Sequence, residues 1–228
     1  MSPAIKENYA RNIFNLNKIL NKTIKIKRSE ILDIISNEIN LENDTSLLDV
    51  GTTSSLEDHE NQIVKFFYKK INISCLSNLE LDNLKDSYKD INTFVGDGRN
   101  MKFQDNKFDI VTSNATIEHV GSSENQIKFI RECVRVCKKK TLITTPNRFH
   151  PLEFHTRLPF IHFFPKRIHR NILKMFGEKF LSTEDNLNLI SKSDLIKFCK
   201  ILNIKNYKIK SINLLGFKSN FILIISKS

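Results

Sequence analysis

Short apolar runs alternate along this chain with longer segments in which apolar residues recur every three or four positions. The runs are bounded by glycine, proline or polar residues, which is typical of buried strands, and they fall at 46–50, 71–76, 91–95, 108–113 and 141–145. The segments between them have the spacing of helices that pack by one face. Strands and helices that alternate in this order form a parallel sheet with helical crossovers, so we expect an α/β fold.

Helices are predicted at 56–70, 79–88 and 192–202, and another is predicted to open at Ser123. Ser123 is followed three residues later by Gln126, which is the spacing of a capping box. The apolar stripe of this helix is predicted to consist of Ile127, Ile130, Val134 and Cys137.

The two ends of the chain and one internal segment depart from this alternation. Residues 3–40 are predicted to be helical, and 207–215 and 220–226 are predicted to form antiparallel strands joined by a tight turn at Gly216. Residues 147–190 hold three of the five prolines and four of the six histidines. An excursion of this length usually serves as a lid or a specialised subdomain.

We therefore expect one domain over residues 1–228 with four parts. These are an N-terminal helical flank at 1–45, a core at 46–146, a lid insert at 147–190, and a last helix with a terminal strand hairpin at 191–228.

Composition narrows the setting of the protein. The net charge is +11, from 36 Lys and Arg against 25 Asp and Glu, which reflects either drift in a chain rich in Lys, Asn and Ile or an anionic partner. The four cysteines lack Cys-x-x-Cys spacing, no apolar run is long enough to span a bilayer, and the N-terminus has no cleavage-site pattern. We expect a cytoplasmic protein, with peripheral contact to the inner face of a membrane left open.

Several short motifs follow one another in a set order in the core segment. They are Leu47-Leu48-Asp49-Val50-Gly51, Val95-Gly96-Asp97-Gly98, Met101-Lys102-Phe103, Phe108-Asp109-Ile110-Val111, Ile117-Glu118-His119-Val120 and Ile143-Thr144-Thr145-Pro146-Asn147. In this order and at this spacing they resemble the class I S-adenosylmethionine-dependent methyltransferases, in particular the methyltransferase type 11 group. The resemblance implies a Rossmann-like, doubly wound, mostly parallel seven-stranded sheet with an antiparallel last strand, flanked by N-terminal helices and a helical lid insert.

The resemblance also implies S-adenosyl-L-methionine as the cofactor and assigns roles to residues at the ends of the strands. Gly51 and the backbone that follows it, including Thr52, would approach the methionine portion, and Asp49 would orient its ammonium end. Asp97 would accept a hydrogen bond from the adenine amino group, while Gly98 would keep the wall of the site open.

At the second and fourth strands the implied roles fall on three more residues. Ser113 and Asn114 would face the sulfonium, and Asn78 would contact the ribose where the family usually has an acid. The family usually also continues with two more glycines after the first strand, where this chain has Thr53 and Ser55. Because of these departures, a scaffold protein that has lost the donor site remains an alternative.

Chemistry at the acceptor calls for a general base when the methylated atom is a hydroxyl oxygen. The loops after the fourth and fifth strands lie side by side in a parallel sheet and supply the candidates. The predicted catalytic residues are Glu118, His119 and His155. The predicted acceptor-binding residues are Arg148, His150, Glu153 and His155. The run at Glu118-His119 is similar to one in metal-assisted O-methyltransferases, but Ala115 replaces the first Glu of that run, and we predict no metal.

The lid contains a basic, amphipathic segment at 165–176. Its predicted apolar face consists of Ile168, Ile172, Leu173 and Phe176, and His162 and His169 are predicted to lie on helix surfaces. The face either packs on the domain, lies on an anionic membrane surface, or helps to hold an anionic acceptor. The apolar run at 158–164 leaves a lipid-linked acceptor open.

The sequence thus predicts a methyltransferase that acts on a small-molecule, glycan or lipid-linked acceptor, at oxygen. The alternatives are the scaffold protein and an RNA methyltransferase, although no RNA-binding motif accompanies the positive charge. Nucleic acid is therefore not the expected partner, and the sequence leaves the oligomeric state open.

Overall fold

The fold is described from a computed structural model, which covers residues 25–39, 44–57, 60–152 and 160–227. The chain divides into two compact units, Met1–Glu38 and Ile39–Ser228. In the first unit residues 25–38 are helical, as predicted for that part of 3–40. The rest of this prediction, at 3–24 and 40, lies outside the described residues.

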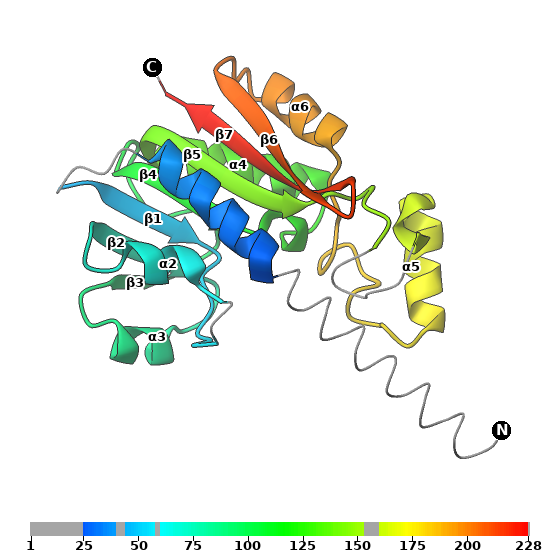
Figure 1. Cartoon of the computed structure of the whole chain (residues 1–228), viewed down its shortest axis with the longest axis horizontal. Coiled ribbons are helices and arrows are strands. Elements are labelled where there is room, and N and C mark those ends of the chain that lie inside the picture. Colours follow the sequence, from blue (N-terminus) through cyan, green and yellow to red (C-terminus); the bar gives the residue numbers. More distant parts are fainter. Residues whose placement is uncertain (1–24, 40–43, 58–59, 153–159, 228) are drawn as a thin grey trace. The chain divides into compact units, whose positions relative to one another are not determined.

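The second unit is built on a single sheet of seven strands (Figure 1). The strands are β1 (Ser46–Val50), β2 (Asn72–Ser77), β3 (Asn92–Val95), β4 (Phe108–Asn114), β5 (Cys137–Pro146), β6 (Tyr207–Leu214) and β7 (Phe217–Ser226). Their order across the sheet is β3-β2-β1-β4-β5-β7-β6, and β7 is antiparallel to both of its neighbours. The predicted doubly wound sheet with an antiparallel last strand is confirmed.

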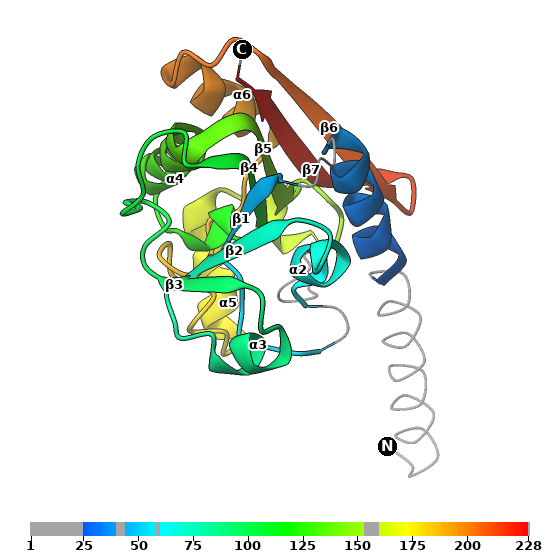
Figure 2. The same cartoon turned by 90° about the vertical axis from the view of Figure 1, so that its left-hand side faces the viewer.

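The alternation of side chains along β1 explains why both faces of the sheet are covered. Leu48 and Val50 belong to a buried cluster with residues of α4 (Ser123–Val136) and α6 (Lys192–Ile201), whereas Leu47 and Asp49 point to the opposite face. Figure 2 shows α4 and α2 (Gln62–Phe67) on opposite sides of the sheet. Parallel strands buried on both faces read as continuous apolar runs, which is the pattern in the sequence.

The helices are placed as predicted, but their ends differ. α2 is shorter than the predicted 56–70, and α3 spans Asp82–Ser87. The cap of α4 is Ser122, whose hydroxyl accepts a hydrogen bond from the amide of Asn125, and not the predicted Ser123.

The predicted stripe of α4 is wrong in part, because the helix ends one residue earlier than the stripe assumed. Cys137 is extended and begins β5, and the residues buried on α4 are Gln126, Phe129, Ile130, Cys133 and Val136. Ile127 and Val134 are only partly buried at the edge of the core.

The described part of 147–190 contains a short 3-10 turn, η2 (Ile161–Phe163), and the helix α5 (Lys166–Met175). Figure 1 shows α5 beyond the carboxyl ends of the parallel strands, outside the helical layers that cover the sheet. Within the described residues, no helix is both long enough and apolar enough to cross a bilayer.

Candidate cofactor and acceptor site

The turn after β1 packs closely on the side chain of Thr116 at Gly51, while the predicted approach of Gly51 to the cofactor stays a prediction. Gly51 has a φ of +91°, and a Cβ atom built on it would lie 2.1 Å from the hydroxyl oxygen of Thr116. Both observations require glycine at this position. Thr116 follows β4, so the end of β1 and the end of β4 pack directly on each other at the carboxyl edge of the sheet.

Asp49 and Thr52 lie beneath this turn. The Asp49 carboxylate accepts hydrogen bonds from the hydroxyls of Thr52 and Thr112, each at 2.9 Å. Burial raises the pKa of the Asp49 carboxyl to about 6, although the two hydroxyls favour the ionised form. These contacts hold the turn in shape. Orientation of the cofactor ammonium group by Asp49 stays a prediction, as does the contact predicted for Thr52.

The loop that carries Thr53 and Ser55 is organised by Asn61. The Asn61 side chain donates to the main-chain oxygens of Thr53 and Ser55 at 2.8 Å and accepts from the Thr53 amide at 3.1 Å. Asn61 therefore closes the loop and makes no side-chain cap on α2, which starts late at Gln62. The loop has a definite shape without the two glycines that the family usually has there.

The ends of β2 and β3 contribute Asn78 and Asp97. Asn78 is exposed directly after β2. Asp97 is half-exposed and receives three contacts of 2.7–3.0 Å from the Arg99 guanidinium, which holds the pKa of its carboxyl below the usual range. The Arg99 amide also donates to Asp97 at 2.8 Å, so Asp97 forms an Asx turn as well. The adenine contact stays a prediction.

Gly98 has a different role from the predicted open wall. A Cβ atom at Gly98 would lie 2.7 Å from the ring of Phe129 and 3.0 Å from Val50. The glycine therefore lets the loop after β3 pack closely on α4.

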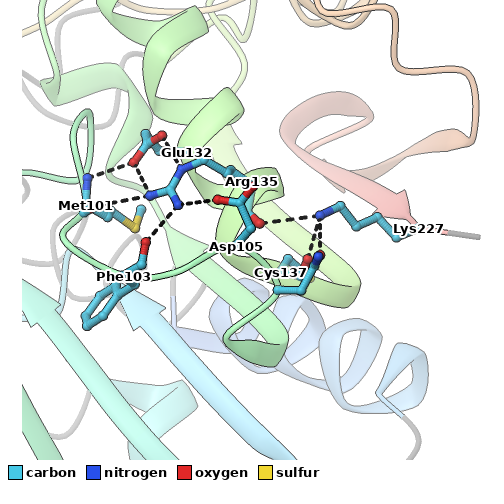
Figure 3. A network of polar contacts seen from close by, with 8 residues as sticks. Met101, Phe103, Asp105, Glu132, Arg135, Cys137 and Lys227 are labelled. Carbon is cyan, nitrogen blue, oxygen red and sulfur yellow. Dashed lines mark hydrogen bonds and ion pairs between the residues drawn. The ribbon is translucent and has the colours of Figure 1, made fainter.

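The same loop is fixed to α4 by a polar network around Arg135 (Figure 3). The guanidinium donates to the main-chain oxygens of Met101 and Phe103 and to the carboxylates of Asp105 and Glu132 at 2.7–2.9 Å. Glu132 in turn accepts from the Met101 amide at 2.8 Å. This network anchors the segment that begins at the Asp97 turn.

The end of β4 is strained and contains polar atoms without partners. Ala115 has a φ of +51°, a conformation that a residue with a Cβ rarely adopts. Ser113 is buried, and its hydroxyl has no hydrogen-bond partner among the described residues. Asn114 is exposed and accepts from the Thr144 hydroxyl at 2.6 Å. Strain and unsatisfied groups of this kind cluster at ligand-binding sites.

Glu118 and His119 lie together in the turn η1 (Ile117–His119) but face different surroundings. Glu118 is fully buried; one carboxylate oxygen accepts from the Thr145 hydroxyl at 3.1 Å, and the other has no hydrogen-bond partner. His119 is exposed, and its Nδ1 lies 2.6 Å from the main-chain oxygen of Asn186 in the lid. Because a carbonyl only accepts, Nδ1 carries the proton and Nε2 is the basic nitrogen.

Asn188 connects the end of the lid to the loop after β4. The main-chain amide of Asn188 donates to the main-chain oxygen of Glu118 at 2.7 Å. The Asn188 side chain donates to the main-chain oxygen of Gly121 at 2.8 Å and accepts from the Lys166 ammonium at 2.5 Å. Sequence reasoning missed Asn188 and Thr116. The only signal for Asn188 was a polar residue inside the apolar run Leu187–Ile190.

The lid places its predicted residues in two environments. Arg148 is half-buried and donates to the main-chain oxygens of His162 and Phe164, and burial lowers its pKa. His150 is buried, and its ring nitrogens contact the main-chain oxygens of Leu152 and Leu214, so its position does not support the predicted acceptor role. Glu153 and His155, the other two predicted acceptor-binding residues, lie outside the described residues.

The prediction for His162 and His169 is wrong, because both are buried. His162 contacts the main-chain oxygen of His150, and its ring lies 6.5 Å from that of His169. The two histidines therefore pack η2 and α5 on the start of the lid at His150. In the described residues no three His, Cys, Asp or Glu side chains come together as a metal site.

Residues 48–144 match the family model described as a methyltransferase domain. No curated protein matches the chain. Among solved structures, a methyltransferase from Methanosarcina mazei has a TM-score of 0.55 at 14% identity, covering 85% of this chain and 96% of that one. Magnesium protoporphyrin IX methyltransferase from Synechocystis, with bound S-adenosylhomocysteine, has a TM-score of 0.59 at 11% identity, covering 93% and 87%.

A further structure, of a putative methyltransferase from Methanococcus maripaludis, has a TM-score of 0.53 at 20% identity and covers 94% of this chain and 91% of that one. The family match over residues 48–144 supports the predicted class of methyltransferase, and the three solved structures confirm the fold.

Proposed function

We propose that this protein transfers a methyl group from S-adenosyl-L-methionine to an oxygen atom of a small-molecule, glycan or lipid-linked acceptor. The observation that supports oxygen best is the hydrogen bond from His119 Nδ1 to the main-chain oxygen of Asn186. It orients a histidine between the loop after β4 and the lid, and it makes Nε2 the nitrogen that can accept a hydroxyl proton.

Several residues of the chain support a cofactor site at the carboxyl edge of the sheet. The tight turn at Gly51 follows β1, Asn78 and Asp97 follow the adjacent strands β2 and β3, and within the described residues the buried Ser113 hydroxyl has no partner. When bound, S-adenosylmethionine supplies a methyl group on a positively charged sulfur. In the role proposed for it, Gly51 admits the methionine portion, Asn78 bonds the ribose and Asp97 bonds the adenine.

In the proposed transfer the acceptor oxygen forms a bond to the methyl carbon as the carbon–sulfur bond breaks. His119 takes the hydroxyl proton at Nε2, and Glu118 positions the turn that carries His119. The lid holds the acceptor close to this nitrogen, and proximity of this kind supplies much of the rate acceleration in such displacements.

Two half-buried cations favour an acceptor with a negatively charged group. Arg148 donates to main-chain oxygens and Lys166 donates to the Asn188 amide oxygen, so the described contacts of both are to neutral atoms. Burial lowers the pKa of Lys166, the nearby Arg148 lowers it further, and the carboxylates of Asp194 and Glu184 offset this only in part. An acceptor carboxylate or phosphate would compensate both charges.

Calorimetry with S-adenosylhomocysteine tests the cofactor site. We expect the intact protein to bind and Asp97→Ala to bind at least about tenfold more weakly, because the adenine loses a charge-assisted hydrogen bond. Lys85→Ala, on the exposed side of α3, should leave binding unchanged. No binding by the intact protein would instead support the scaffold alternative.

A second measurement tests oxygen chemistry at His119. Transfer of a labelled methyl group to the aqueous and lipid fractions of a cell extract should fall by about 10²-fold or more in His119→Ala, while S-adenosylhomocysteine binding stays the same. Labelled product that survives treatment with base indicates an ether, whereas product lost by hydrolysis indicates an ester. Equal transfer by the variant would contradict the proposed base.

A further inference from the structure

The exposed apolar side chains of this protein are concentrated in one segment. Half of the exposed large hydrophobic residues in the described chain lie between Phe149 and Phe180. They are Phe149, Phe160, Phe163, Phe164, Ile168, Met175, Phe176 and Phe180. Single exposed apolar residues are ordinary, but a group of this size in one segment marks an interaction surface.

Helix α5 shows how this surface is built. Leu173 and His169 are buried and attach one face of the helix to the domain. Ile168 and Met175 lie seven residues apart on another face, and they are 46% and 85% exposed. Of the predicted apolar face, Leu173 is buried, Ile172 is partly buried, and Ile168 and Phe176 are exposed, so only part of it packs on the domain.

Positive charges lie beside the apolar face. By their helical positions, Arg167 and Lys174 lie next to Ile168 and Met175, and both cations are exposed. The sequence of α5 contains no acidic residue, and Glu178 follows just after its end. A helix with a cationic face next to a protruding apolar face is typical of segments that lie in a membrane interface.

Aromatic rings form a second exposed group at the turn η2, which precedes α5 in the chain. The rings of Phe149 and Phe160 both lie about 6 Å from that of Phe163, so the three form one exposed cluster. Figure 1 shows α5 outside the covered sheet, beyond the strand ends that carry the candidate site. A flat partner can therefore reach this helix without displacing the core.

We propose that α5 and this aromatic cluster dock the protein on an anionic lipid bilayer, with Met175 and Phe176 inserted among the lipids and Arg167 and Lys174 on the headgroups. Charge complementarity selects the bilayer over a second copy of this chain, because two copies would bring the same basic helix against itself. Docking would hold the entrance to the candidate site close to acceptors in the membrane. Docking does not require the cofactor, so the test of docking is independent of the test of the proposed function.

Sedimentation of the full-length protein with vesicles tests the proposal. Binding to phosphatidylcholine vesicles that contain phosphatidylglycerol should be at least about tenfold stronger than to phosphatidylcholine alone, and it should weaken with salt. Substitution of Met175→Ser together with Phe176→Ser should lower it by about tenfold or more. Leu215→Ser, at an equally exposed position in the β6–β7 turn, is the matched control and should bind as the intact protein does.

Charge reversal provides the second arm. Arg167→Glu with Lys174→Glu should abolish the preference for the anionic vesicles, whereas the same change at Lys128 and Arg131 on α4 should retain it. Two results would overturn the proposal. The first is equal vesicle binding by the α5 variants and their controls. The second is an intact protein that binds no vesicles and instead forms a dimer, with the serine substitutions dissociating that dimer.

Discussion

Replacing Arg135 with methionine is expected to destabilise the protein strongly, because one guanidinium organises the loop between β3 and β4. The Arg135 side chain is 27% exposed and that of its partner Glu132 is 13% exposed. The substitution keeps the volume of the side chain but removes the donors to two main-chain oxygens and leaves a nearly buried carboxylate without its cation. Asp105, at 71% exposure, regains water and contributes little.

The magnitude follows from these losses. At about 1–1.5 kcal/mol for each of the two oxygens and the carboxylate, reduced for partial exposure, the free energy of unfolding should fall by about 2–4 kcal/mol. For a domain of this size that lowers the melting temperature by roughly 4–16 °C. Equilibrium unfolding in urea measures the change, and Arg131→Met, at an exposed position on the same helix, is the control. A difference of less than about 0.5 kcal/mol between the two variants would refute the reasoning.

The pH dependence gives an independent check of the same network. Arg135 holds the pKa of Glu132 below its model-compound value of 4.5, so the pair contributes stability above that pH and loses it as the pH falls further. The difference in stability between the intact protein and Arg135→Met should therefore narrow below about pH 4.5. A constant difference would show that the network acts by packing alone.

Two further substitutions test the turn after β1. Burial raises the pKa of the Asp49 carboxyl to about 6, so ionisation of this group destabilises the folded protein as the pH rises from the unfolded pKa to above 6. Asp49→Asn should therefore stabilise the protein by about 1–3 kcal/mol at pH 8 and by almost nothing below pH 4. Urea unfolding at both pH values measures the difference. Gly51→Ala should cost about 2–4 kcal/mol in the same assay, and Thr116→Gly should recover the part that is due to the clash. If the second change recovers nothing, backbone strain alone explains the loss.

The strands could be predicted from the sequence because the strands of a parallel sheet that is covered on both faces are continuous apolar runs. All seven predicted strands occur, with ends shifted by at most four residues. The errors at the helix ends arose where one polar side chain fixes the nearby backbone. Asn61 closes the loop after β1 and therefore leaves α2 short, and Ser122 caps α4 in place of its neighbour.

The candidate site was only partly predictable for a related reason. Gly51 and Asp97 follow strands and Ser113 lies near the end of β4. Because the ends of parallel strands meet at one edge of the sheet, their placement at this edge could be inferred. The contact of Thr116 with Gly51 and the bonds of Asn188 depend on how loops cross in space. The burial of His162 and His169 likewise depends on the path of the lid, and the sequence around these two residues does not predict that burial.

The region around the end of β4 combines three features that oppose folding. Within the described residues, Ala115 has a strained backbone, the Ser113 hydroxyl is buried without a partner, and so is one oxygen of the Glu118 carboxylate. Each of the three opposes folding by about 1–3 kcal/mol. They lie beside Gly51, where β1 and β4 meet, and features of this kind cluster at ligand-binding sites. They therefore support the proposal that the cofactor binds at this edge of the sheet.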